Sequence, residues 1–127
     1  MAARKRLKAP LEENCTLERI LKEVSDIVSL IDDAQRVMNE LVRLTTSLLR
    51  VSNCSLVLLQ PETDELRIHA AFGLDAEVVR NWRARVGQGI TGWVARTGKP
   101  ARVGDVQSDP RYILLRPEVR SELAVPL

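Results

Sequence analysis

Three glycines with phosphate-binding spacing are the first candidate for chemistry in this chain of 127 residues. Gly87, Gly89 and Gly92 match the Gly-x-Gly-x-x-Gly pattern of dinucleotide-binding loops, and Asp109 lies about where such loops place the acid that binds the ribose. That pattern needs a buried apolar strand before its first glycine and a crossover helix after it. The preceding segment 81–85 is too charged for a buried parallel strand. We therefore expect a structural turn, and a nucleotide-binding enzyme domain is the less favoured alternative.

The other reactive side chains do not form a catalytic or metal-binding set. His69 is the only histidine, and strand alternation puts it on one face with Arg67, so we expect it to face solvent. Cys15 and Cys54 have neither metal-ligand spacing nor a CxxC arrangement, and we expect free thiols. No nucleophile, base and orienting acid fall into a recognisable pattern. We therefore predict no enzyme activity, no catalytic residue and no metal site, and leave the cofactor open.

Two helices are predicted in the N-terminal third of the chain. Asp32-x-x-Gln35 resembles a capping box and predicts a new helix, or a kinked continuation, through Arg50. The helix before it, over residues 16–31, is assigned to signalling or dimerisation. Its apolar residues alternate at spacings of four and three, as in a coiled-coil seam formed by Leu17, Leu21, Val24, Val28 and Ile31. We favour a homodimer through this seam, and packing on the chain's own sheet is the alternative.

The charge pattern separates a basic N-terminal tail from a nearly neutral body. The net charge is +2, and the first eight residues hold no acid but four basic residues, at Arg4, Lys5, Arg6 and Lys8. We predict a flexible tail over residues 1–15. No nucleic-acid partner is expected, because the tail has no interleaved aromatic residues. No apolar run approaches the roughly 20 residues of a membrane span, and there is no secretory signal, so we expect a cytoplasmic protein.

A hairpin and a short helix are predicted for the middle of the chain. Strands over 55–59 and 66–72 flank a polar turn at 61–65. The glycine turn runs into a short helix that ends at Gly98, where Pro100 prevents a restart. Helices and antiparallel strands in this order predict an α+β fold.

These pieces together resemble a GAF domain, the small sensory module of signalling proteins. The resemblance runs from Ala34 to the end of the chain, and we assign residues 32–127 to a GAF-like domain. It rests on Cys54-Ser-Leu-Val-Leu-Leu, Leu66-x-Ile68-x-Ala70-Ala-Phe-Gly-Leu, Gly87-x-Gly89-Ile-Thr-Gly, Gly98-Lys-Pro, Asp105-Val and Ser121-Glu-Leu-Ala-Val-Pro-Leu127. The resemblance implies a long N-terminal helix, a central antiparallel sheet with helices on one face, and a ligand cavity under the loops between Gly87 and Glu122. It also implies further strands and a closing helix beyond Leu127, so we expect an incomplete domain.

The function implied by the resemblance is regulation of an attached output domain in a bacterial signal-transduction protein. Binding of a small molecule would shift the packing of paired N-terminal helices, and a ligand-free dimerisation module is the alternative. No cysteine occurs from Ser55 to Leu127, which argues against a covalent bilin and against methionine sulfoxide reduction. By themselves, Asp105 and Asp109 are typical of a strand end and a turn start. The ligand-facing candidates that the resemblance implies are Val94, Asp105, Asp109, Tyr112 and Ser121.

Overall fold

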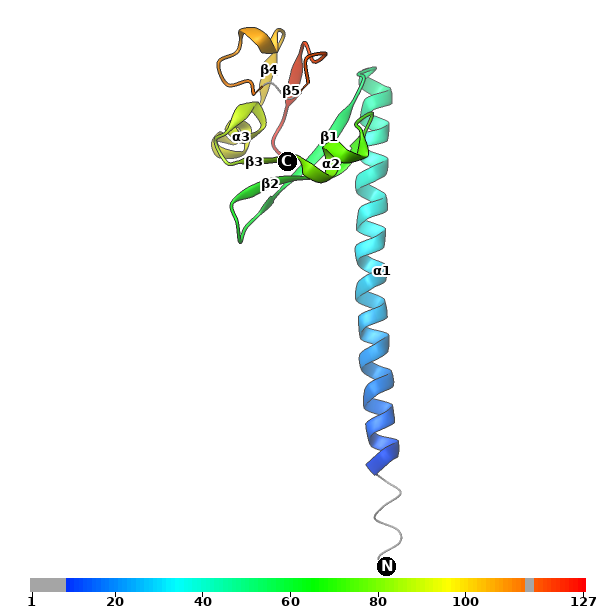
Figure 1. Cartoon of the computed structure of the whole chain (residues 1–127). Coiled ribbons are helices and arrows are strands. Elements are labelled where there is room, and N and C mark those ends of the chain that lie inside the picture. Colours follow the sequence, from blue (N-terminus) through cyan, green and yellow to red (C-terminus); the bar gives the residue numbers. More distant parts are fainter. Residues whose placement is uncertain (1–8, 114–115) are drawn as a thin grey trace, which may run out of the picture. The chain divides into compact units, whose positions relative to one another are not determined.

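One continuous helix forms the N-terminal part of the protein (Figure 1). The computed structural model describes residues 9–113 and 116–127, and it divides into two units, residues 1–41 and 42–127. Helix α1 (Ala9–Leu49) has 41 residues and runs from the first unit into the second. It begins inside the tail predicted for residues 1–15, whose four basic residues lie outside the described part of the chain.

Of the two alternatives predicted at Asp32, a new helix and a kinked continuation, the new helix is wrong, because one helix runs through this residue. The segment 11–49 contains neither glycine nor proline, so no residue in it interrupts the backbone hydrogen bonding of a helix. The amide of the Gln35 side chain donates to the Asn39 side chain at 3.1 Å, one turn further along the same helix. A capping-box pattern therefore occurs here in a helix interior.

The predicted hairpin is present at the centre of the second unit. Strand β1 (Cys54–Gln60) pairs antiparallel with β2 (Glu65–Phe72), and the three-residue β3 (Arg83–Arg85) pairs antiparallel with β2. The register shifts between Leu56 and Val57, where His69 is the additional residue on β2. His69 was expected to face solvent, but it is half-buried, and its Nε2 lies 3.0 Å from the Gln60 side-chain amide nitrogen.

A second, two-stranded sheet lies further along the chain. Helix α2 (Ala76–Asn81) leads into β3, and helix α3 (Gly89–Thr97) follows the glycine turn and ends at Gly98, whose φ of 64° is left-handed. Strand β4 (Ala101–Val103), the 3-10 turn η1 (Val106–Ser108) and β5 (Glu122–Ala124) come next, and β4 pairs antiparallel with β5. The α+β class is confirmed. The described strands form two sheets, in the orders β1-β2-β3 and β4-β5, and not the single sheet that was expected.

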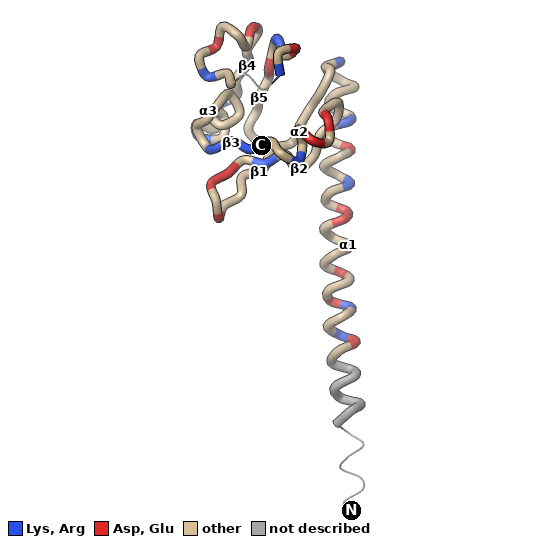
Figure 2. The backbone as a smooth tube through the Cα atoms, in the orientation of Figure 1, with Lys and Arg blue, Asp and Glu red and all other residues tan. Residues whose placement is uncertain are grey.

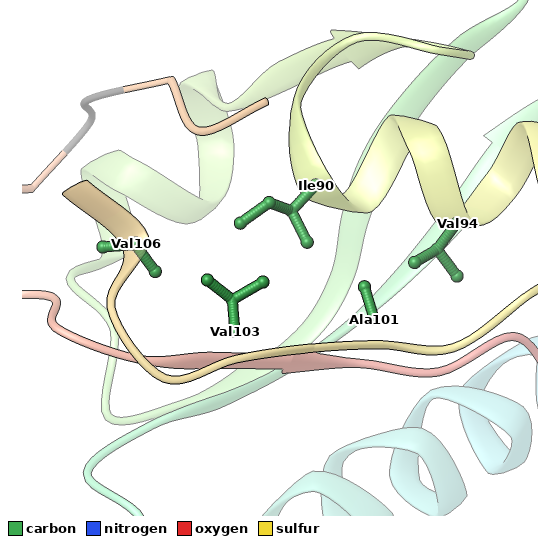
Figure 3. Packing of buried hydrophobic residues seen from close by; sticks show 5 residues of the cluster. All are labelled: Ile90, Val94, Ala101, Val103 and Val106. Atoms are coloured by element: carbon green, nitrogen blue, oxygen red, sulfur yellow. The ribbon is translucent and has the colours of Figure 1, made fainter. Parts of the chain in front are cut away.

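The core of the second unit lies between α3, β4 and η1 (Figure 3). Val106 has no exposed surface, and the side chains of Trp93 and Tyr112 pack against this core from its edge. Its buried members are Ile90, Val94, Ala101, Val103 and Val106. The core therefore fixes the positions of α3 and of the segment that follows η1.

Candidate functional site

The glycine turn is shaped by contacts within the backbone. A Cβ atom on Gly92 would lie 2.5 Å from the carbonyl oxygen of Arg85, and the Gly87 amide donates to the Gly92 carbonyl oxygen at 2.7 Å. Gly87 has a φ of 89°, in the region that favours glycine. The strand before the turn, β3, is antiparallel, whereas a dinucleotide-binding loop follows a parallel strand. The glycine spacing is thus accounted for by close packing of the turn against the start of α3.

Two of the five predicted ligand-facing residues lie in the core or at the surface. Val94 points into the core beside Ala101 and is 5% exposed (Figure 3). Ser121 is exposed immediately before β5. Neither residue lies among the polar groups described below, and both assignments stay predictions.

Asp105 caps the 3-10 turn η1. Its carboxylate accepts hydrogen bonds from the Gln107 amide at 3.1 Å and from the Ser108 hydroxyl at 2.6 Å. These two bonds, the one from Ser108 above all, hold the pKa of Asp105 below its usual value. The strand-end interpretation of this residue thus describes what its side chain does in the structure.

Asp109 and Arg111 form a rigid ion pair over an aromatic ring. The Asp109 carboxylate accepts from the Arg111 amide at 2.9 Å, from Nε at 2.9 Å and from Nη2 at 2.6 Å. The guanidinium also lies over the Trp93 ring, with Cζ at 4.6 Å from its centre. Hydrogen bonding from Arg111 lowers the pKa of Asp109 to about 2. Arg111, in the loop after η1, therefore contacts Trp93 on helix α3 while it is bonded to Asp109.

Glu122 lies in the same region but was not among the predicted ligand-facing residues. It opens β5, and its Oε1 accepts a hydrogen bond from the Thr91 hydroxyl on α3 at 3.3 Å. Burial raises the pKa of Glu122, and the negative charge of Asp109 raises it further. The alternation of side chains along a strand could have indicated this burial, because Glu122 and Ala124 lie on the same face of β5. That face is half-buried, whereas Leu123 on the other face is exposed.

Tyr112 adjoins the same charges. Its amide donates to the Asp109 carbonyl oxygen at 3.0 Å, and its hydroxyl donates to the Arg116 carbonyl oxygen at 3.4 Å. Burial, followed by the charge of Glu122, raises the pKa of the phenol. The residues that the fold brings together, called the Glu122 cluster from here on, are Thr91, Trp93, Asp109, Arg111, Tyr112 and Glu122.

The Glu122 cluster brings charged, polar and aromatic side chains together. It holds a half-buried carboxylate, whose charged form is disfavoured by burial, beside a fixed ion pair and two aromatic rings. An added cation or hydrogen-bond donor would stabilise that charged form. Among residues 9–113 and 116–127, no three His, Cys, Asp or Glu side chains are grouped to hold a metal ion. In the same described part, no helix has the length and apolar composition of a membrane span.

Comparisons with known proteins agree on one family. A family model described as "GAF domain" matches residues 31–127. The Nif-specific regulatory protein of Herbaspirillum seropedicae is 31% identical over 91 residues, which are 72% of this chain and 17% of that protein. The chain thus spans less than a fifth of the length of this relative.

Solved structures show the same fold. The GAF domain of a phosphoenolpyruvate-protein phosphotransferase from Coxiella burnetii superimposes with a TM-score of 0.67 at 24% identity, over 85% of this chain and 67% of that one. The free methionine-R-sulfoxide reductase of Neisseria meningitidis, solved in complex with its substrate, gives a TM-score of 0.66 at 25% identity, over 73% and 53%.

Proposed function

Because this chain belongs to the GAF domain family, we propose that it is a sensory, regulatory domain that binds a small molecule at the Glu122 cluster. The relatives named Nif-specific regulatory proteins support a role in signal transduction. They are several times longer than this chain, which supports an output domain on the same polypeptide. In this proposal the bound state of the cluster controls that output domain.

The observation that carries the proposal is the half-buried carboxylate of Glu122. In the described part of the chain the carboxylate accepts a hydrogen bond from Thr91, at 3.3 Å, while Nε and Nη2 of Arg111 donate to Asp109. A ligand with an ammonium group or several hydrogen-bond donors would complete this environment. An amino acid or its derivative has that chemistry, and the neighbour from Neisseria meningitidis is a protein that acts on free methionine sulfoxide.

The test of ligand binding is native mass spectrometry of the purified protein, alone and with millimolar free methionine sulfoxide as the probe. We expect bound mass on the wild type and on the exposed control Glu62→Gln, and its loss in Glu122→Gln. Glutamine keeps an acceptor for Thr91 but removes the charge, so the fold should be retained. Equal bound mass on Glu122→Gln, or none on any of the three, would contradict the site.

We also propose that the domain is not an enzyme. The structural neighbour from Neisseria meningitidis is a reductase, but here the sequence holds no cysteine after Cys54. Burial raises the pKa of the Cys54 thiol, which disfavours the reactive thiolate. Incubation with methionine sulfoxide and a thiol reductant should therefore release no methionine above the level without protein.

Dimerisation through α1 is the second candidate function. The apolar seam predicted from the sequence is more than half exposed at each position, Leu17, Leu21, Val24, Val28 and Ile31. Exposed apolar residues at coiled-coil spacing favour pairing with a second subunit. A ligand-free dimerisation module would keep this pairing and show no bound mass in the experiment above.

A further inference from the structure

Three arginines lie on one face of the β1-β2-β3 sheet. The residues of β3 and β2 that lie directly opposite one another are Arg83 and Arg67, Ala84 and Leu66, and Arg85 and Glu65. Ala84 and Leu66 are buried, at 9% and 3% exposure, so they mark the buried face. Because side chains alternate along a strand, the residues on either side of them share the other face. We call the basic side chains of that face the arginine face, and they are Arg67, Arg83 and Arg85 (Figure 2).

Two of these arginines directly oppose each other. Arg67 on β2 is the cross-strand neighbour of Arg83 on β3, and like charges in this relation destabilise a sheet. Glu65 offsets part of the repulsion, because its Oε2 accepts a hydrogen bond from Arg67 Nη2 at 3.0 Å. The Nε atom of Arg67 is buried and has no hydrogen-bond partner in the described part of the chain. Repulsion between the two guanidinium groups and the lack of this acceptor both favour an added oxyanion.

The two arginines of β3 are exposed and retain available donors. Arg83 Nη1 donates to the Trp82 carbonyl oxygen at 2.6 Å, which leaves further N–H groups of its guanidinium free to bind. No carboxylate of a described residue lies within ion-pair distance of Arg83 or Arg85. Residues two positions apart on a strand are separated by about 7 Å. Strand β3 therefore presents two unneutralised guanidinium groups from backbone positions with that spacing.

Protection of the sheet edge explains only part of this charge. Strand β3 lies at the edge of its sheet, and charged side chains there deter pairing with another chain. Arg67 is on the inner strand β2, where such protection is not required. The backbone of Arg85 is also occupied, since its amide donates to Gln88 Oε1 at 3.1 Å and its carbonyl oxygen accepts from the Gln88 amide at 2.9 Å. A partner would therefore contact the arginine face through side chains and not as an added strand.

We propose that the arginine face binds an acidic, extended peptide segment of a partner protein. In an extended segment, residues i and i+2 point to the same side at about the spacing of Arg83 and Arg85. Two carboxylates in this arrangement can each accept paired hydrogen bonds from one guanidinium, and a third acid can balance Arg67 opposite Arg83. A phosphate group concentrates its charge at one point and would leave part of the face unbalanced. The arginine face shares no residue with the Glu122 cluster, so this partner is additional to the proposed small molecule.

The test is the fluorescence anisotropy of labelled hexaglutamate, titrated with the purified protein at low ionic strength. We expect saturable binding by the wild type and no binding of labelled hexaglutamine. The double variant Arg83→Gln/Arg85→Gln removes two positive charges from exposed positions and should weaken hexaglutamate binding by about tenfold or more. Added salt should weaken the wild-type binding as well, because it screens exposed charges.

A second double variant is the matched control for net charge. Arg102→Gln/Arg120→Gln also removes two exposed arginines, one on β4 and one shortly before β5. It should bind hexaglutamate nearly as well as the wild type. All four substituted side chains are exposed, and far-UV circular dichroism would verify that both double variants keep their fold.

Four other results would overturn the proposal. Equal weakening in the two double variants would mean that net charge, and not the arginine face, attracts the peptide. Unchanged binding by Arg83→Gln/Arg85→Gln, or no binding by the wild type, would remove the arginine face as a peptide site. Displacement of the peptide by inorganic phosphate, but not by chloride at the same ionic strength, would assign the face to a phosphate ligand instead. Methionine sulfoxide takes no part in these titrations, so their outcome is independent of the test of the Glu122 cluster.

Discussion

Asp109 combines a short ion pair with a position at the start of a turn. The three hydrogen bonds that its carboxylate accepts all come from Arg111, whose guanidinium in turn lies over Trp93. A bidentate arginine with a ring beneath it has little freedom to move, so the loop after η1 is held at one point. The pair thus supports the position of the neighbouring Glu122 and Tyr112.

The lowered pKa of Asp109 makes a testable contribution to the pH dependence of stability. Its pKa falls from 3.8 to about 2 on folding, so its ionised form stabilises the fold above about pH 4, and this contribution is lost as the pH falls towards 2. We expect Asp109→Asn to have a lower melting temperature at neutral pH and a shallower decline between about pH 4 and 2. Thermal melts followed by circular dichroism measure both, with Glu62→Gln as the exposed control. Parallel declines in wild type and Asp109→Asn would contradict the assignment.

Sequence reasoning reached part of the Glu122 cluster. Asp109 and Tyr112 were among the candidates, and they do lie together. Glu122 was left out, because its significance comes from its contact with Thr91 and from its burial, and these depend on the packing of α3 against β5. Val94 was included although it fills the core. The spacing of apolar residues on a nine-residue helix does not distinguish a core face from a ligand face.

At the scale of elements, the glycine turn and α3 act as one packed unit. Gly92 lies against the carbonyl oxygen of Arg85 and the backbone of Gly87, with no space for a side chain. The turn therefore holds the start of α3, which carries Thr91 and Trp93, at a fixed distance from β3.

We expect Gly92→Ala to lower the free energy of unfolding by about 1–3 kcal/mol, the usual cost of overpacking. The added methyl group would have to displace the Arg85 carbonyl oxygen, which is backbone and cannot rotate away. Gly104→Ala is the matched control, because no atom lies within 4 Å of its Cβ position. Urea denaturation of both variants provides the measurement. A loss in Gly92→Ala no larger than in Gly104→Ala would contradict the packing argument.

Elements set by local signals were predicted, and those set by distant contacts were not. The β1–β2 hairpin and the end of α3 at Gly98 follow from turn residues nearby in the sequence. The bulge at His69 and the division into two sheets depend on pairings that no local pattern specifies. The continuity of α1 through Asp32 was left open beside a new helix, because a capping pattern was weighed against the absence of helix breakers.

At the scale of the whole molecule, the last turns of α1 belong to the same unit as the Glu122 cluster. The last turns of α1 bury Val42 on one side and expose Leu44 and Leu48 on the other. A ligand that changes the packing of the unit can thereby change the pairing free energy of the helix, and pairing must change ligand affinity by the same factor.

Pairing through α1 also predicts a concentration-dependent melting temperature. For a dimer that separates on unfolding, mass action raises the melting temperature as protein concentration increases. We expect this rise for the wild type over about a hundredfold range of concentration. The Val24→Asp variant, which places a charge in the seam predicted from the sequence, should melt at one temperature throughout. Scanning calorimetry at several concentrations makes the comparison, and a wild-type melting temperature that does not change would count against an obligate pair.

The β4–β5 pairing also determines the order in which the molecule assembles. Val103 pairs with Glu122, whereas Gln60 pairs with Glu65 across the short turn of the hairpin. Closing the longer loop loses more chain entropy, so the hairpin forms early and β5 docks late. Because β5 brings Glu122 to Thr91, we expect the Glu122 cluster to be complete only after β5 has docked. By the same argument we expect β5 to separate from β4 while the hairpin stays intact, so a ligand bound at the Glu122 cluster would stabilise the β4–β5 pairing.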